Sequence, residues 1–186
     1  MSQLHTYIEL TRDLVDRLAK LCDVPYELDA ISSVCLQNGW ELVPLEEWET
    51  DGDPFLRVQI ANDGPQMIAV WGAESIAGLP LAVVFQDDVT VDIAESTWGE
   101  FDSLFFAARS LCERHLAPAT RNGTYHSDWQ CHEFHFALFQ CRHSTLAILQ
   151  HHEGDGHLGN DASLDVRIIP MAAECVPVPL ETDLIF

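Results

Sequence analysis

Apolar residues recur at three- and four-residue steps in three parts of the chain, and this spacing predicts three amphipathic helices. The first covers residues 4–21, with charged side chains on its other side. The second begins with Asp23 as N-cap and with Pro25 in its first turn, where a backbone N–H is not needed. It ends at Asn38 and Gly39, a pair typical of helix C-termini.

The third helix is expected over residues 97–116. Thr97 and Glu100 have the spacing of a capping box, in which each side chain binds a backbone N–H at the start of the helix. A wide apolar stripe over residues 101–112 follows, and Pro118 lies just beyond the expected end. This segment carries the strongest helical pattern in the chain.

Alternating apolar and polar residues predict short β-strands before and after the third helix. Before it, the predicted strands are residues 55–61, 66–71, 81–85 and 89–94, the last two forming a hairpin, and a further short strand is considered at residues 40–44. After it, they are residues 132–139, 145–152 and 164–168. Turn-forming residues separate these segments, and the stretch from Arg121 to Gly123 is expected to lie in a loop.

These elements predict an α+β fold with three helices and antiparallel β-meanders, in the order α-α-β-β-β-β-α-β-β-β. Because the strands cluster into hairpins and do not alternate with helices, an antiparallel sheet is favoured over a parallel one. At 186 residues the chain is expected to form one compact domain, residues 1–186. Residues 1–95 and 96–186 each contain a helix followed by a meander, which suggests two similar halves.

Charge changes the picture more than overall composition does. Thirty Asp and Glu residues stand against nine Lys and Arg, for a formal net charge of −21. Residues 21–108 contain seventeen of these acids and a single basic residue, Arg57. This charge disfavours nucleic acid and anionic membranes as partners and favours a basic protein. The alternative interpretation is that acidity serves only solubility.

Neither a signal peptide nor an apolar run long enough to cross a bilayer is found, so a cytoplasmic location is expected. The six cysteines are widely spaced and include no C-x-x-C pair. They are interpreted as buried, reduced thiols and not as a disulfide framework.

Seven of the nine histidines lie between His126 and His157, which raises the question of a metal site. In a strand, Cys131, Glu133 and His135 would share one face, but H-E-x-x-H spacing is absent. His151 and His152 would face opposite ways. The acidic turns at residues 51–53 and 153–161 lack the ligand spacing of a calcium loop. We therefore expect structural histidines, with no metal and no cofactor.

Signatures of catalysis are also lacking. The sequence contains no G-x-S-x-G elbow and no glycine-rich phosphate loop. Cys112 and His115 are close enough on the third helix to touch, yet Cys112 belongs to the apolar stripe and is interpreted as an inert buried thiol. No catalytic residue is assigned, and the chain is not expected to be an enzyme.

One acidic stretch contains interleaved aromatic residues, which serve as anchors in many binding interfaces. It extends from Trp40 to Phe55, and the acidic turn at residues 86–88 is added to it. The candidate partner-interface residues are Glu41, Glu46, Glu47, Trp48, Glu49, Asp51, Asp53, Asp87 and Asp88. The alternative interpretation is a solvated loop with Trp48 folded back into the core.

The acidic character, the helix at residues 97–116, and the later segments around Trp129, 132–138 and 164–169 resemble the immunity proteins of bacterial polymorphic-toxin systems. That resemblance covers about the last half of the chain and contains no diagnostic motif. It implies a cytoplasmic inhibitor that occludes the basic active site of a cognate toxin. Two alternatives remain open: a metal-dependent enzyme built on residues 126–157, and an inhibitor of a host enzyme that mimics nucleic acid.

Overall fold

The protein is described by a computed structural model that covers residues 2–44, 55–59, 66–70, 77–86, 93–126, 132–153 and 161–179. Within these ranges lie three helices, α1 (Arg12–Cys22), α2 (Leu28–Gln37) and α3 (Glu95–His115). The strands are β1 (Ser2–Thr6), β2 (Glu41–Pro44), β3 (Phe55–Gln59), β4 (Gln66–Val70), β5 (Ala77–Gln86), β6 (Arg121–His126), β7 (Glu133–Gln140), β8 (Thr145–Glu153) and β9 (Asp161–Ile169).

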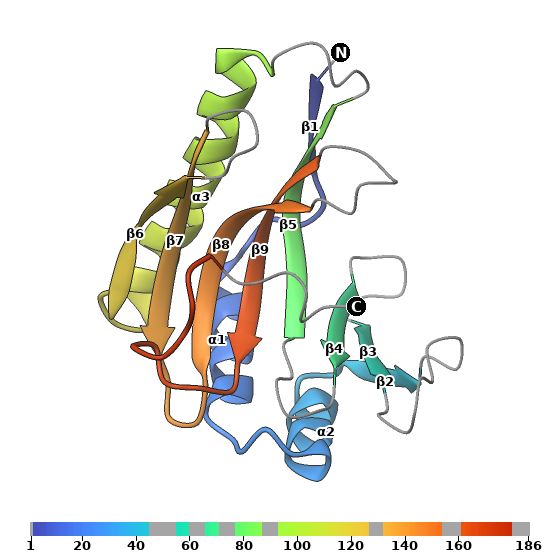
Figure 1. Ribbon diagram of the computed structural model, residues 1–186. Helices are drawn as coiled ribbons and strands as arrows, with labels where there is room; N and C mark the ends of the chain where they lie inside the picture. Colours follow the sequence, from blue (N-terminus) through green and yellow to red (C-terminus); the bar gives the residue numbers. More distant parts are fainter. Residues whose placement is uncertain are drawn as a thin grey trace.

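All of these strands belong to one antiparallel sheet, in the order β2-β3-β4-β5-β9-β8-β7-β6 (Figure 1). β1 lies off this path and pairs with β5, which places Leu4 opposite Val84. β5 and β9 join the strands that precede α3 to those that follow it. The predicted α+β class, with three helices and antiparallel strands, is confirmed.

The chain before α1 differs from the prediction. The helix expected over residues 4–21 begins only at Arg12, because Thr11 caps it by accepting a hydrogen bond from the backbone N–H of Leu14 at 3.3 Å. Residues 2–6 form β1 instead, since the edge of β5 offers them a hydrogen-bonding partner. The apolar residues of this segment therefore reach the core from a strand.

The start of α2 was also predicted incorrectly. Asp23 is the C-terminal cap of α1 and not the N-cap of α2, because its backbone N–H bonds to the carbonyl of Ala19 at 3.0 Å. α2 begins at Leu28 and has no side-chain cap. Its predicted end at Asn38 is confirmed, and Gly39 adopts a φ of 72°, a conformation that glycine allows without strain.

α3 ends as predicted, with Leu116 as C-cap, but it begins two residues earlier than expected. Ala94 is the N-cap, and its carbonyl accepts from the backbone N–H groups of Thr97 and Trp98. Thr97 and Glu100 thus lie inside the helix, and the predicted capping box is wrong. The buried residues of the apolar stripe are Phe101, Phe105, Ala108 and Cys112.

Each face of the sheet buries its own set of apolar side chains. α1 and α3 lie behind β7–β9 in Figure 1, and the larger core fills the space between these helices and the sheet. On the other face, residues 170–179 cross in front of β7 and β8 and cover a smaller apolar cluster. The Arg121 guanidinium fastens this segment by donating to the carbonyl oxygens of Ala173 and Val176, both at 2.9 Å.

Two further segments correct the predicted strand pattern. The expected loop at Arg121–Gly123 is the start of β6, which pairs with β7 through its backbone and needs no apolar alternation. Of the strand predicted at residues 89–94, only Ile93 and Ala94 are described, and they lead into α3 without strand structure. No described helix is long and apolar enough to cross a membrane.

Candidate functional site

The predicted partner-interface residues fall almost entirely outside the described part of the chain. Glu41 is the exception, because it begins β2, where its backbone lies opposite Gln59. The other predicted residues are Glu46, Glu47, Trp48, Glu49, Asp51, Asp53, Asp87 and Asp88, and none is described. Their role in an interface stays a prediction from the sequence.

A half-buried polar cluster lies between α3 and the start of β7. Asp102 of α3 is its centre: one carboxylate oxygen lies 3.3 Å from Nε2 of His132 and 3.7 Å from Nε2 of His135. The same oxygen accepts a hydrogen bond from the Gln150 amide at 3.0 Å. We call these four residues the helix-side cluster. It brings together His132 and His135, which are three residues apart in the sequence.

Aromatic rings from α3 hold both imidazoles of this cluster. The Trp98 ring stacks on that of His132 at 3.9 Å between centroids and 9° between planes. Phe105 stacks on His135 at 5.2 Å, and Phe106 lies 4.8 Å from the same ring. Phe106 is 47% exposed, which makes it one of the few large apolar side chains at the described surface. These ring contacts hold the imidazoles with their Nε2 atoms towards the Asp102 carboxylate.

Burial and charge oppose each other in the helix-side cluster. Burial alone would raise the pKa of Asp102, but hydrogen bonds from His132 and Gln150 outweigh it and lower the pKa below its usual value. Burial lowers the pKa of His135, and the Asp102 charge offsets only part of that effect. The cluster therefore keeps an ionised carboxylate beside an imidazole that resists protonation, an arrangement that can accept a proton or a hydrogen bond.

Gln150 links the helix-side cluster to a gap in the ladder between β7 and β8. The paired residues of these strands run from Phe136 opposite Leu149 down to the turn. Before Phe136, the side chain of Gln150 takes the place of a backbone acceptor, because its Oε1 accepts a hydrogen bond from the backbone N–H of His135 at 2.9 Å. The Tyr125 hydroxyl donates to the backbone carbonyl of Gln150 at 2.5 Å. The backbone groups at the gap are thus satisfied by side chains.

A second cluster is buried on the opposite face of the sheet, and we call it the sheet-face cluster. His151, Asp165 and Arg167 are each less than 9% exposed. One Asp165 oxygen lies 2.8 Å from Nε2 of His151 and accepts from the Arg167 guanidinium at 2.9 Å. Ser163, the cross-strand neighbour of His151, is fully buried, and its hydroxyl has no hydrogen-bond partner among the described residues.

The sheet-face cluster strongly favours an ionised Asp165. Complete burial would raise the pKa of this carboxyl, but His151 and Arg167 outweigh burial through charge and hydrogen bonds and lower the pKa to about 2. Arg167 also lies 2.7 Å from Nε2 of His151, so Asp165 and Arg167 compete for one ring nitrogen. Within the described part of the chain, Nδ1 of the same ring and the second Asp165 oxygen are buried without a hydrogen-bond partner.

The metal-ligand set considered from the sequence is not brought together in the described residues. Glu133 lies 3.2 Å from His126 on the neighbouring strand, whereas His135 faces Asp102. Cys131 lies outside the described residues. Within the described ranges, no group of three or more His, Cys, Asp or Glu side chains has a geometry that would hold a metal ion.

Cys112 is buried, as the helical pattern predicted, and burial raises the pKa of its thiol to about 12. Asp102, Gln150, Asp165 and Arg167 were not among the residues predicted from the sequence. The last two carried a usable signal, because an Asp-x-Arg pair lies within an apolar strand. The contact of Asp102 with His132 joins residues 30 apart and has no local signature.

No protein-family model, no curated protein and no solved structure matches this chain.

Proposed function

We propose that this chain is an acidic inhibitor of a basic protein, acting in the manner of the toxin immunity proteins that its sequence resembles. The observation that carries the proposal is the charge of residues 21–108, where seventeen carboxylates accompany one basic residue. Such an excess cannot be neutralised from within the segment. Mobile ions or a cationic partner must balance it, and a partner gains association rate from the same field.

The ion pairs of the described residues support this interpretation. Four arginines are engaged within the chain: Arg12 with Asp16, Arg17 with Asp13, Arg109 with Glu113 and Arg167 with Asp165. None of these carboxylates belongs to residues 21–108. In the described ion pairs, Asp102 is the single carboxylate from that segment, and its partners are histidines. In the described part of the chain, these four arginines therefore do not compensate the carboxylates of residues 21–108.

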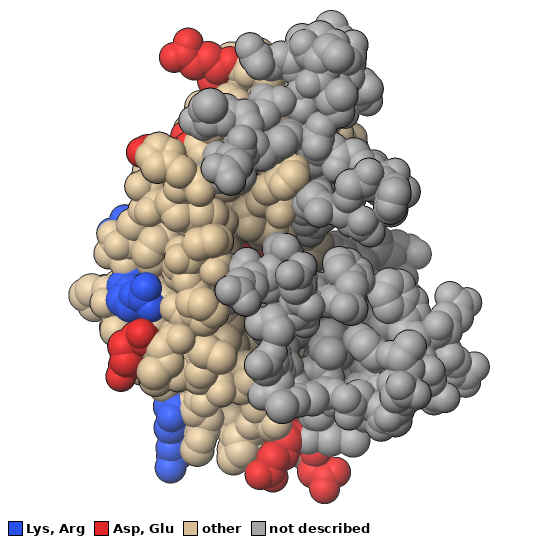
Figure 2. Space-filling view, viewed as in Figure 1, with Lys and Arg blue, Asp and Glu red and all other residues tan. Residues whose placement is uncertain are grey.

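The described part of the sheet face that carries residues 170–179 offers little charge of its own. In the coloured part of Figure 2, neutral side chains predominate and the charged ones lie towards the edges. We therefore assign the docking surface to the acidic segments and not to this described part of the face. The proposed mechanism is occlusion, in which carboxylates pair with the Arg and Lys side chains of a basic cleft and exclude its substrate.

Co-expression tests this function directly. If the adjacent gene encodes a secreted protein with a toxic C-terminal domain, that domain is expressed in a bacterial host with and without this chain. We expect growth to be restored only when both are present. Failure to rescue growth, together with no complex between the two purified proteins, would contradict the proposal.

Charge reversal then tests the acidic stretch. Changing Glu46, Glu47 and Glu49 to Lys is expected to slow association at low salt by about tenfold or more and to weaken its salt dependence. A matched control reverses Glu9, Glu133 and Glu174, which are exposed and lie outside residues 21–108. Equal effects of the two triple variants would show that net charge acts without a defined interface at the acidic stretch.

Metal analysis separates the inhibitor from the enzyme alternative. The untagged protein is purified and its zinc and iron contents are measured. About one equivalent of either metal would favour a metal-dependent enzyme built on residues 126–157 and contradict the inhibitor proposal.

A further inference from the structure

Two cysteines that are far apart in the sequence meet at one end of the molecule. Cys22 is the last residue of α1 and is fully buried, and Cys141 follows β7 and is half-buried. The backbone holds the two segments together, because the N–H of His143 donates to the Cys22 carbonyl at 3.1 Å. The N–H of Arg142 donates to the Asp23 carboxylate at 3.2 Å. The contact is therefore a fixed part of the fold.

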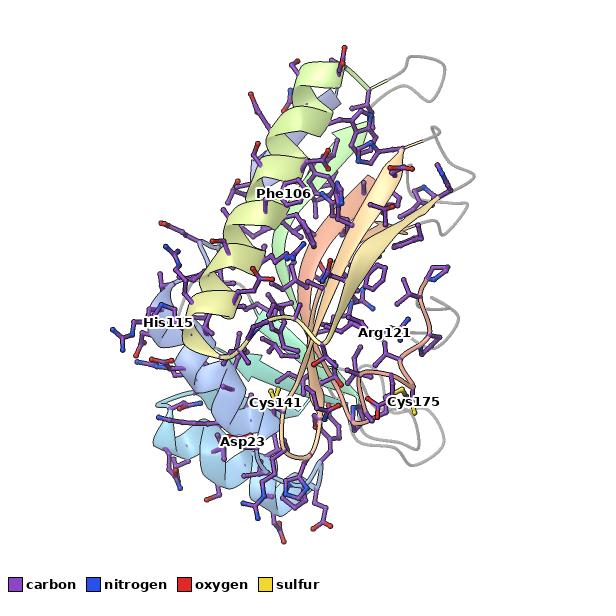
Figure 3. The ribbon with its side chains drawn as sticks, turned by 90° about the vertical axis from the view of Figure 1, so that its left-hand side faces the viewer. Asp23, Phe106, His115, Arg121, Cys141 and Cys175 are labelled. Carbon is purple, nitrogen blue, oxygen red and sulfur yellow. The ribbon has the colours of Figure 1, made fainter. Side chains whose placement is uncertain are left out.

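Figure 3 shows where this junction lies. Asp23 and Cys141 are at the same end, on the helix side of the sheet, and Cys175 lies on the other side with residues 170–179. The turn that carries Cys141 is closed by a hydrogen bond from its N–H to the Ser144 carbonyl at 3.0 Å. The sulfur of Cys141 is thus presented by a tight, ordered turn against the end of a helix.

The side chains of Cys22 and Cys141 interact, and hydrogen bonding between them is the largest influence on the pKa of both thiols. The Cys22 thiol is the donor, and this hydrogen bond lowers the pKa of Cys141, as does a second one from the backbone N–H of Leu146. The same contact, with burial, raises the pKa of Cys22 well above its ordinary value. Cys141 therefore ionises more readily than an ordinary thiol, whereas Cys22 keeps its proton.

We propose that Cys141 is a peroxide-reactive thiol and that Cys22 resolves its oxidised form, so that oxidation closes a Cys22–Cys141 disulfide. The arrangement has the three features of redox-sensing cysteines: a stabilised thiolate, access to solvent and a second thiol in contact. This proposal is independent of the inhibitor function.

The chemistry balances with hydrogen peroxide as the oxidant. The Cys141 thiolate attacks one peroxide oxygen, the O–O bond breaks, and the departing hydroxide takes up a proton to leave as water. Cys141 is then a sulfenic acid. The Cys22 sulfur attacks the sulfenic sulfur, its proton joins the leaving hydroxide, and a second water departs. Two electrons pass from the thiol pair to the peroxide.

The other described cysteines lack this combination of features. Burial raises the pKa of Cys35 to about 11 and that of Cys112 to about 12, so neither is a ready nucleophile. Cys175 is exposed, and it lies on the far side of the sheet from Cys141 (Figure 3). Cys112 is the competing partner for Cys22, because a charge on Cys112 acts on the Cys22 thiol and raises its pKa. Cys112 and Cys175 therefore provide the matched controls.

Mass spectrometry tests the proposal on the full chain. The reduced protein is treated with a few equivalents of hydrogen peroxide, and free thiols are blocked with N-ethylmaleimide. We expect two of the six cysteines to escape alkylation, and proteolysis to yield a peptide pair linked through Cys22 and Cys141. The crosslink closes a loop of roughly 120 residues, so we expect the oxidised protein to melt about 5–10 °C higher than the reduced one.

Single substitutions assign the two roles. Cys22→Ser is expected to leave Cys141 as a sulfenic acid that dimedone traps, and Cys141→Ser to abolish both the dimedone adduct and the crosslink. Cys112→Ser and Cys175→Ser are expected to form the crosslink as the wild type does. A crosslink between any other pair, or over-oxidation of Cys141 without a crosslink in the wild-type protein, would overturn the proposal even if a variant failed to fold.

Discussion

Two His–Asp clusters lie on opposite faces of the same sheet, and they differ in what surrounds the carboxylate. Asp165 on the sheet face is buried and is paired with Arg167 as well as with His151. Asp102 on the helix side is paired with two histidines and an amide, and its side chain is 26% exposed. A fixed cation and full burial make the first cluster a permanent charge pair. The second has no arginine, and its ion-pair partners are histidines.

The comparison also explains why a concentration of histidines in the sequence does not form one site. His132 and His135 face α3. His151 faces the other way, because it follows Gln150 in β8, which contacts Asp102 of α3, and neighbouring residues in a strand point to opposite faces of the sheet. His126 lies on the edge strand β6 beside Glu133, and His143 is exposed in the turn after β7. These five histidines are close together in the sequence, but they occupy four separate environments in the structure.

Removing the Asp165 carboxylate is expected to have the largest effect. Asp165→Asn leaves the guanidinium of Arg167 buried without a counter-charge, and we expect a loss of about 3–5 kcal/mol in the free energy of unfolding. Urea denaturation followed by tryptophan fluorescence measures it. In the double variant Asp165→Leu with Arg167→Met no buried charge is left unpaired, so we expect it to lose less than half as much. If the double variant is as unstable as the single one, the charge pair is not the cause.

Acid titration sharpens the same comparison with a smaller effect. Because the pKa of Asp165 is lowered to about 2 in the folded state, its contribution is complete above the unfolded pKa near 4. It is lost as the pH falls from about 4 to about 2, and it amounts to about 2 kcal/mol. Asp102 acts in the same direction, because its pKa is also lowered. Urea midpoints between pH 5 and pH 2.5 should fall more steeply for the wild type than for the Asp165→Leu, Arg167→Met variant, and equal slopes would contradict this.

The fold was predictable wherever local chemistry determines it. The apolar stripe of α3 and the end of α2 at Asn38 depend on neighbouring residues, and both were predicted correctly. β1 and β6 were missed because each is specified by the exposed edge of another strand, distant in the sequence. Thr97 and Glu100 have the spacing of a cap, but Ala94 starts the helix first. Local signals therefore predict elements better than their boundaries.

The clusters were less predictable than the fold, for the same reason. From the sequence alone, an Asp in a strand is expected to face solvent. Asp165 is buried because its face of the sheet is covered by other residues. Asp102 was one of many acids in an acidic chain, and its two histidines come from beyond a turn and a strand. In the acidic interface the limit is different, because only Glu41 of the predicted residues is described.

The helix-side cluster should respond to substitution through protonation more than through stability. Asp102→Asn keeps an oxygen acceptor for Gln150, so we expect a loss of only about 1 kcal/mol in the free energy of unfolding. The negative charge that supports protonation of His135 disappears, so its pKa, already lowered by burial, should fall further. NMR titration of the imidazole protons measures this shift. His152 is the internal reference, because its lowered pKa arises from burial and from His151, and Asp102 plays no part in it. A His135 pKa that rises or stays constant would mean that Asp102 supports the ring by position alone, and the distinction between a permanent and a protonation-dependent cluster would fail.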